Sequence, residues 1–130
     1  MLKGIGTDLV YIPRIQKILD QGGEEDPFFL HTFTEKERME ASLQARKAEF
    51  YASRFAVKEA VFKVLAPILK DQSPDLRKIE SLHREDGSPY VNTEGYLRPY
   101  LEQAGIRMIL ISVSADHEYA SAIAAGESVH

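Results

Sequence analysis

The sequence has no cysteine among its 130 residues, which excludes disulfides, thiolate metal sites and cysteine nucleophiles together. It also has no apolar run long enough to cross a membrane, and residues 1–10 carry Lys3 and Asp8 where a signal peptide would have its apolar core. A glycine-rich phosphate loop and the Ser, His and Asp order of hydrolases are both missing. We therefore expect a soluble cytoplasmic protein without a membrane partner.

Positive charge is in deficit as well. Sixteen Lys and Arg residues stand against twenty Asp and Glu residues, so the formal net charge is -4 and no overall field attracts the chain to nucleic acid. An anionic ligand would therefore need a local cluster of cations. With 44% hydrophobic and 28% charged residues, the sequence fits one globular domain spanning residues 1–130.

Hydrophobic periodicity and turn residues predict an α+β domain with a small antiparallel sheet. Thr34 and Glu37 have the spacing of a capping box at a helix start, and Thr93 is the expected cap of a later helix that Gly105 ends. The predicted elements, in chain order, are a strand over 2–10, helices over 13–21, 34–42 and 47–69, a β segment over 78–91 with a turn at 86–89, a helix over 93–104, and strands over 107–114 and 119–125.

The long helix over 47–69 carries a pair of charges away from its apolar face. At about 100° per residue, its core-facing residues are expected to be Phe50, Val57, Val61, Val64 and Ile68. Glu59 and Lys63 fall roughly opposite this face, one turn apart. The residues beside the pair are small, namely Ala52, Ala56 and Ala60. This pattern predicts that another group approaches the helix closely there.

The simplest interpretation of Glu59 and Lys63 is a solvated ion pair worth about 0.2 to 0.5 kcal/mol, with no functional meaning. Asp8, at the end of the first strand, is equally explained as a turn aspartate satisfied by backbone N–H groups. The alternative is a phosphate site, because a cluster of cations surrounds Glu59 in an otherwise acidic chain. That cluster consists of Arg46, Lys47, Arg54, Lys58 and Lys63. Composition and spacing leave both interpretations open.

A phosphate site of this kind would suit Mg²⁺. The ion prefers oxygen ligands and usually takes one or two carboxylates together with phosphate oxygens and water, and Asp8 and Glu59 are the candidate carboxylates. Attack on a diphosphate builds negative charge on the phosphoryl oxygens and the leaving phosphate, which Mg²⁺ and Lys63 would stabilise. A carboxylate or a metal-held water could accept the proton of an incoming serine hydroxyl.

Two motifs take the interpretation further: Gly6-Thr7-Asp8-Leu9-Val10, followed by Arg14-Ile15, and Arg54-Phe55-Ala56-Val57-Lys58-Glu59-Ala60 with Lys63. Together they resemble the holo-acyl-carrier-protein synthase family, the small bacterial type of 4′-phosphopantetheinyl transferase. Asp86-Gly87-Ser88-Pro89-Tyr90 and Ile111-Ser112-Val113-Ser114 also stand where that family has its G-x-P turn and a serine-bearing strand. The resemblance covers nearly the whole chain and implies the 4′-phosphopantetheinyl transferase fold.

The resemblance implies roles for individual residues. Asp8 and Glu59 match the family's metal ligands, with Glu59 also a candidate for activating the acceptor serine, and Lys63 matches the lysine that contacts the diphosphate. Arg14 matches a basic position on the first helix that meets the acidic recognition helix of the carrier protein. The remaining residues match the coenzyme A site: Arg46, Arg54 and Lys58 near its phosphates, and Gly87, Pro89 and Ser114 lining its cleft.

The implied activity is transfer of the 4′-phosphopantetheine arm of coenzyme A to a serine of apo acyl-carrier protein, with Mg²⁺ as cofactor. Its products would be holo acyl-carrier protein and adenosine 3′,5′-bisphosphate. The activity would support fatty acid biosynthesis. Members of the family typically form homotrimers with the active site between subunits.

Two departures from the family keep an alternative open, namely a carrier-protein or coenzyme A binding module with impaired catalysis. Ala115 stands where the family usually has His, with His117 close by as a partial replacement. Residues 66–69 stand where the family often has a Gly-Thr-Gly turn.

Overall fold

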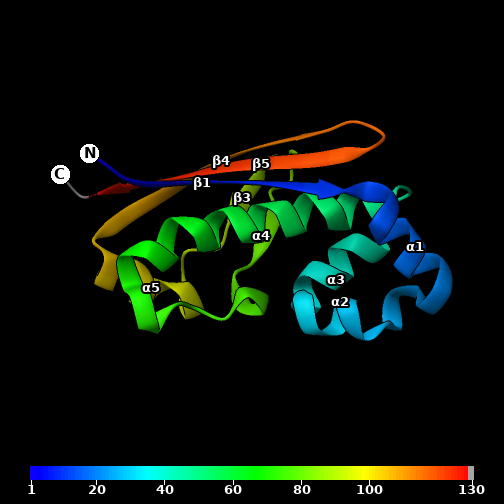
Figure 1. Ribbon diagram of the computed structural model, residues 1–130, viewed down its shortest axis with the longest axis horizontal. Coiled ribbons are helices and arrows are strands. Elements are labelled where there is room, and N and C mark those ends of the chain that lie inside the picture. Colours follow the sequence, from blue (N-terminus) through cyan, green and yellow to red (C-terminus); the bar gives the residue numbers. More distant parts are fainter. Residues whose placement is uncertain (129–130) are drawn as a thin grey trace.

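The protein has two layers, a sheet and the helices that cover one of its faces, in a computed structural model that describes residues 1–128 (Figure 1). Residues 129–130 of the predicted domain lie outside that range. The helices are α1 (Ile12–Gly22), α2 (Pro27–Thr32), α3 (Glu35–Ser42), α4 (Lys47–Leu69) and α5 (Arg98–Ala104). The strands are β1 (Leu2–Tyr11), β2 (Ser81–His83), β3 (Pro89–Val91), β4 (Ile106–Ala115) and β5 (Tyr119–Ser128). Within residues 1–128, no helix is long and apolar enough to span a bilayer.

The main sheet is antiparallel with the strand order β1-β5-β4, and β2 and β3 form a separate antiparallel hairpin. Helix α4 runs along the sheet, with α1, α2 and α3 at one end and α5 at the other (Figure 1). Alternate residues of the long strands face α4, and these are the buried ones, for example Val10, Ala120, Ala122 and Ala124. The predicted α+β class with antiparallel strands is therefore confirmed.

Several predicted boundaries are confirmed. Helix α4 spans the predicted residues 47–69, and the capping box between Thr34 and Glu37 is present at the start of α3. Gly105 ends α5 in the left-handed region, with φ 72. The β segment over 78–91 is present, but only β2 and β3 within it are strands.

The sequence analysis missed one helix and misplaced the start of another. The short helix α2 was not predicted, although Asp26 accepts from the backbone N–H of Phe28 as its cap and Pro27 lies in its first turn. Thr93 does not cap a helix, because a 3₁₀ turn over Gly95–Leu97 intervenes and α5 starts at Arg98.

Strand β1 approaches α4 closely because small residues face each other at the contact. Gly6 lies over Ala60, and a Cβ added to Gly6 would lie 2.1 Å from the Ala60 carbonyl oxygen. Ala52, Ala56 and Ala60 are all fully buried. The predicted close approach is confirmed, and the approaching group is β1 itself. The expectation of one apolar face on α4 is too simple, because residues are buried almost all round this helix.

A buried ion pair joins α4 to α3. Lys58 and Glu37 both have 0% side-chain exposure, and Lys58 Nζ donates to Glu37 Oε1 at 2.8 Å. The same ammonium donates to the carbonyls of Arg77 and Ile79 at 2.7 Å each, while Glu37 Oε2 accepts from the Ser81 N–H at 2.8 Å. Burial lowers the pKa of Lys58 and raises the pKa of Glu37, and the charge of each partner opposes the other's shift. All three N–H groups of this ammonium are thus used inside the protein.

We expect Lys58→Met to lower the free energy of unfolding by about 3 to 5 kcal/mol, because it leaves the Glu37 carboxylate buried without its charge partner. A Glu37→Gln/Lys58→Met double variant should recover much of that loss. Urea denaturation followed by circular dichroism measures both. Lys36→Met, which alters an exposed lysine of α3, is the matched control and should change stability by less than about 0.5 kcal/mol. Equal stability of the Lys58 and Lys36 variants would contradict a role for the pair in holding α3 on α4.

Candidate active site

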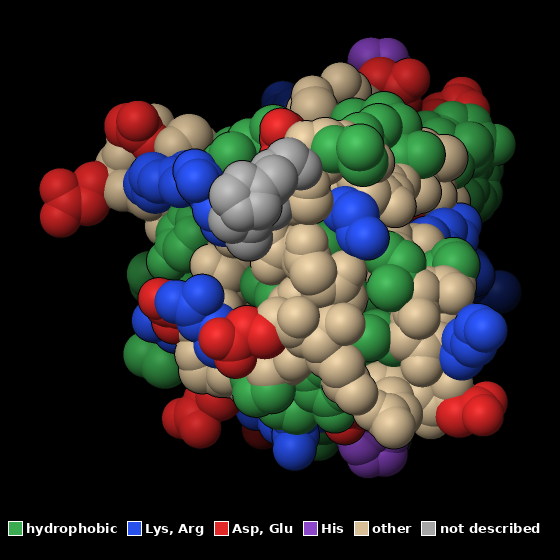
Figure 2. All heavy atoms as spheres, turned by 90° about the vertical axis from the view of Figure 1, so that its left-hand side faces the viewer, with side chains coloured by type: hydrophobic (Ala, Val, Ile, Leu, Met, Phe, Trp, Pro, Cys, Tyr) green, Lys and Arg blue, Asp and Glu red, His purple; other side chains and the backbone are tan. Residues whose placement is uncertain are grey.

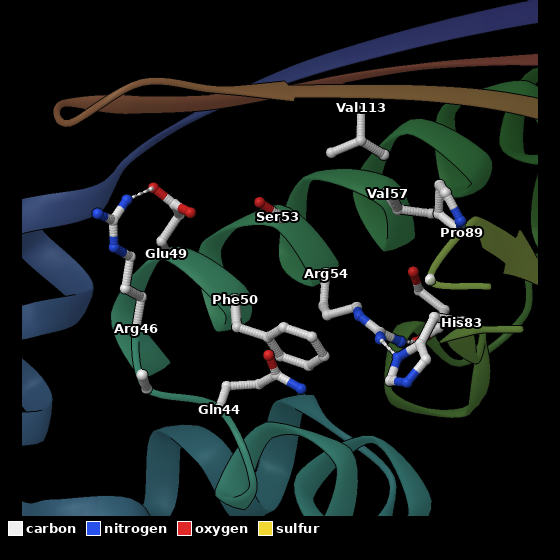
Figure 3. Close-up of a pocket in the computed structure, with 13 residues that line it drawn as sticks. Gln44, Arg46, Glu49, Phe50, Ser53, Arg54, Val57, His83, Pro89 and Val113 are labelled. Atoms are coloured by element: carbon white, nitrogen blue, oxygen red, sulfur yellow. Dashed lines mark hydrogen bonds and ion pairs between the residues drawn. The ribbon is translucent and has the colours of Figure 1, made fainter. Parts of the chain in front are cut away.

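A pocket of about 580 Å³ lies between the N-terminal half of α4, the β2–β3 hairpin and β4 (Figure 3). Small-molecule sites typically have volumes of about 300 to 1,000 Å³. Helix α4 contributes a stripe of side chains at helical spacing: Phe50, Ser53, Arg54 and Val57. The other walls include Gln44 to Arg46 before the helix, Ser81, His83, Gly87 and Pro89 of the hairpin, and Val113 of β4.

Three of the predicted coenzyme residues line this pocket without being held by strong interactions with other protein groups, namely Arg46, Gly87 and Pro89. Gly87 has φ 87, a conformation that favours glycine, and lies in the turn that leads to Pro89. Arg46 is 84% exposed, and its ion pair with Glu49 is long, at 4.0 Å. Because exposed pairs of this kind are weak, the Arg46 guanidinium is available to an anion.

A second pocket adjoins the first and shares Arg46 and Glu49 with it. Its far wall is the β4–β5 turn, with Ala115, Asp116 and His117. The Asp116 carboxylate accepts from two backbone N–H groups of this turn at 2.7 Å each, and these hydrogen bonds lower the pKa of Asp116. His117 therefore stands on a groove shared with Arg46, whereas Ala115 offers no polar group.

Arg54 also lines the first pocket, but its guanidinium is committed to protein partners. NH1 donates to the Ser81 carbonyl, and NH2 lies 2.8 Å from both Glu40 Oε1 and His83 Nδ1. Its Cζ is 4.3 Å from the centroid of the Phe50 ring. Burial lowers the pKa of Arg54, and the charge of Glu40 opposes that shift. Arg54 therefore fixes the walls of the pocket.

Two predicted coenzyme residues, Lys58 and Ser114, do not line this pocket. Lys58 presents no free N–H to a ligand, because its ammonium is fully buried among Glu37 and two backbone carbonyls. Ser114 follows Val113, which lines the pocket, and successive strand residues point to opposite faces. Ser114 therefore faces away from α4, on the outer side of the sheet.

The three predicted catalytic residues lie together where β1 meets α4. Lys63 Nζ donates to the Thr7 carbonyl at 2.9 Å and lies 3.3 Å from Asp8 Oδ1. Glu59 precedes Lys63 by one helical turn, and its pKa is raised first by burial and then by the charge of Asp8, while Lys63 acts in the opposite direction. The two carboxylates are thus close enough to repel each other.

The chemistry of this donor set fits Mg²⁺. Asp8 and Glu59 offer hard oxygen ligands, and Mg²⁺ commonly takes one or two carboxylates, completing its shell with phosphate oxygens and water. Within residues 1–128, no group of three or more His, Cys, Asp or Glu side chains is gathered as a fuller protein cage would require. Burial first and the Asp8 charge second raise the pKa of Glu59, and a divalent cation would relieve the repulsion from Asp8. The side chains of Asp8 and Lys63 are 18% and 50% exposed, so a ligand can reach them.

Helix α4 separates the pocket from the carboxylates. Phe50, Arg54 and Val57 point to the pocket, whereas Glu59 and Lys63 fall roughly opposite around the helix. A ligand in the pocket of one chain therefore lies on a different side of α4 from the carboxylates of that chain.

Sequence reasoning placed Arg14 correctly on α1, where it is exposed. It assigned Phe50 to the core and overlooked Ser53 and His83, which line the pocket. The helical spacing of Phe50, Ser53 and Arg54 was a usable signal. His83 pairs with Pro89 across the hairpin, so the identified G-x-P turn also pointed to it.

Residues 4–124 match the family model described as the 4′-phosphopantetheinyl transferase superfamily. The chain is 37% identical over 122 residues to the holo-[acyl-carrier-protein] synthase of Thermodesulfovibrio yellowstonii, covering 94% of this chain and 96% of that protein. Among solved structures, it resembles the holo-[acyl-carrier-protein] synthase of Neisseria meningitidis with a TM-score of 0.82 and 27% identity, over 98% of this chain and 100% of the other.

The Chronobacterium ammoniagenes ACPS–CoA complex gives a TM-score of 0.75 and 27% identity, over 98% of both chains. The similarity thus covers nearly the whole chain, in sequence and in overall fold. On these grounds the chain belongs to the 4′-phosphopantetheinyl transferase superfamily.

Proposed function

We propose that the chain transfers 4′-phosphopantetheine from coenzyme A to a serine of apo acyl-carrier protein, with Mg²⁺ as cofactor, in support of fatty acid biosynthesis. Holo-acyl-carrier-protein synthase activity itself follows from family membership. The observation that carries the finer proposal is the meeting of Asp8, Glu59 and Lys63 at one place. We treat residues 1–130 as one catalytic domain, and its cytoplasmic location stays a prediction.

The nucleotide portion of coenzyme A is assigned to the pocket beside α4. Phe50, Val57 and Val113 give it apolar walls that suit the faces of a purine ring. Arg46 stands at its rim as an available guanidinium, a group that binds phosphate well. Gly87 and Pro89 close the hairpin side, while Arg54 supports the walls.

The reaction forms one bond to phosphorus and breaks another. The serine oxygen attacks the phosphorus that carries pantetheine, and the bond from this phosphorus to the oxygen of the adenosine phosphate breaks. The electron pair leaves with adenosine 3′,5′-bisphosphate. Glu59, directly or through a water, accepts the serine proton. Lys63 Nζ provides positive charge beside the diphosphate oxygens as negative charge builds there.

Asp8 and Glu59 are the residues that would hold Mg²⁺. When bound, Mg²⁺ would offset the negative charge of the diphosphate and polarise its phosphoryl oxygens. The hydrogen bond from Lys63 to the Thr7 carbonyl keeps the ammonium next to this place and orients it along β1.

We further propose a homotrimer in which the pocket of one subunit meets the carboxylates of its neighbour. The outer face of the sheet carries several exposed hydrophobic residues, and Figure 2 shows hydrophobic side chains along the upper edge of the molecule, where the sheet lies in Figure 1. The exposed hydrophobic residues of this face are Ile5, Leu9, Tyr11, Leu110, Tyr119 and Ile123. A patch of this kind on a soluble protein favours an interface. Ser114 lies on the same face, so it could serve a coenzyme held by a neighbouring subunit.

A carrier assay tests the proposal. We expect the wild-type protein, with coenzyme A and Mg²⁺, to add phosphopantetheine to apo acyl-carrier protein, detected as a mass gain of the carrier. Lys63→Ala should lower kcat by about 100- to 1,000-fold, the scale for one charged stabiliser, and Glu59→Gln by at least about 100-fold. Lys70→Ala, at the far end of α4, is the control and should be near wild type.

The same assay distinguishes an active transferase from the alternative, a binding module with impaired catalysis. A binding module with impaired catalysis would bind coenzyme A without modifying any carrier, and Glu59→Gln would then change nothing. If neither the wild-type protein nor Glu59→Gln increases the mass of the carrier, the proposed activity is contradicted.

Mixed oligomers test the shared site. One variant lacks the carboxylates (Asp8→Asn/Glu59→Gln), and the other has a damaged pocket (Arg46→Ala/Phe50→Ala). Each alone should be nearly inactive. A cyclic trimer mixed statistically from the two should regain roughly a quarter of wild-type activity, because one contact in each mixed trimer joins two intact halves. No recovery, with native mass spectrometry showing mixed trimers, would place the whole site within one chain.

Carrier docking is assigned to Arg14 on α1, where a guanidinium is exposed to an acidic partner. We expect Arg14→Glu to raise the KM for acyl-carrier protein about tenfold or more, since the charge reversal opposes the partner's acidic helix. The KM for coenzyme A should stay the same. Lys70→Glu makes the same charge change directly after α4, at the end of that helix away from α1 (Figure 1), and should leave both KM values unaltered. An unchanged carrier KM for Arg14→Glu would remove α1 from the docking surface.

A further inference from the structure

His83 lies in the wall of the pocket at the end of β2, beside Arg54 and Phe50 (Figure 3). Its side chain is 33% exposed. The ring meets Phe50 edge-on, with centroids 6.1 Å apart and an interplanar angle of 86°. No role assigned so far uses this side chain, although its position is fixed on two sides.

The contact with Arg54 favours one tautomer of His83. A guanidinium has donors only, so the 2.8 Å contact between Arg54 NH2 and Nδ1 is a hydrogen bond when Nδ1 accepts. A neutral imidazole that accepts at Nδ1 carries its proton on Nε2. Glu40 Oε1 lies 3.1 Å from the same Nδ1 and also accepts from Arg54 NH2 at 2.8 Å, so it holds the guanidinium beside the ring. The Nε2–H has no hydrogen-bond partner within the part of the chain that the structure describes.

The two buried basic groups near this wall, Lys58 and Arg54, already donate to protein partners. Lys58 donates to Glu37 and two carbonyls, and Arg54 donates to Glu40, His83 and Ser81. Arg46 is available, but it stands at the rim with an exposed side chain. A ligand seated between Phe50 and the hairpin therefore finds in His83 Nε2–H a fixed and unused donor.

We propose that His83 Nε2–H donates a hydrogen bond to the adenosine 3′,5′-bisphosphate portion of coenzyme A, and that Arg54 and Glu40 are positioning residues that hold this tautomer. The inference rests on the proposed function, because it takes the pocket as the nucleotide site. The acceptor is a phosphate oxygen or a ring nitrogen of the nucleotide, both of which an imidazole N–H suits.

Isothermal titration with adenosine 3′,5′-bisphosphate tests the contact. His83→Ala should weaken binding about tenfold or more, the effect of losing one hydrogen bond to a charged ligand. His83→Gln, whose amide nitrogen can donate from a similar place, should stay within about threefold of wild type. His31→Ala, which alters an exposed histidine of α2, is the control and should bind as wild type does.

Imidazole ¹⁵N spectra provide a readout independent of stability. The His83 signals should show an unprotonated Nδ1 and a protonated Nε2, and adding the nucleotide should shift Nε2 more than any other histidine nitrogen. Arg54→Lys should lose the single tautomer and weaken binding, because it removes the planar donor that Nδ1 accepts from.

Different results would contradict the assignment of the pocket to the nucleotide and the role of His83 within it. Wild-type protein that does not bind adenosine 3′,5′-bisphosphate would overturn both the assignment of the pocket and the role of His83. Wild-type binding with an equally tight His83→Ala variant, or a Nε2 signal that the nucleotide does not shift, would overturn the role of His83 alone.

Discussion

The contact between β1 and α4 is the constraint on which the candidate site depends. Gly6 has no side chain, so the strand can lie directly on the Ala60 carbonyl, where even one added carbon would be 2.1 Å from the oxygen. Asp8 lies two residues further on the same face of β1 and therefore reaches Lys63. One close contact thus builds part of the core and brings a carboxylate from the first strand to the charges of the long helix. A wider spacing between β1 and α4 would separate these groups without changing any of them.

The pocket on the other side of α4 is held by polar contacts instead. Glu37 and Lys58 pair inside the protein, and Arg54 links Glu40 to His83 and the backbone of β2. Buried charges are costly unless they are paired and hydrogen-bonded, so these groups tolerate few alternative arrangements. They fix α3 and the hairpin relative to α4. The basic residues of the helix motif thereby divide into supports, which are buried, and groups such as Arg46 that remain free to meet a ligand.

The sequence predicted the elements that have strong local signals. It did not predict side-chain positions that depend on contacts between two elements. The boundaries of α4 and the capping box at Thr34 follow from local spacing. The burial of Lys58 does not, because its partner comes from another helix, 21 residues away. The orientation of Ser114 depends on the phase of β4, and a shift of one residue reverses the face of every side chain. The meeting of Asp8 with Lys63 was one of two open interpretations until the family resemblance favoured it, since 55 residues separate them.

The two departures from the family lie outside the catalytic cluster, which weakens the case for impaired catalysis. Where the family often has a glycine turn, α4 continues through Pro67 to Leu69, and Lys70 takes the left-handed conformation with φ 55 that a glycine would otherwise supply. This change begins beyond Lys63 and leaves the one-turn spacing from Glu59 to Lys63 unaltered. Ala115 removes a polar group from the rim of the second pocket, but His117 stands on the same rim with Arg46. The altered turn after α4 lies outside both pockets, and Ala115 borders only the second one, while the groups proposed to carry the reaction keep their arrangement.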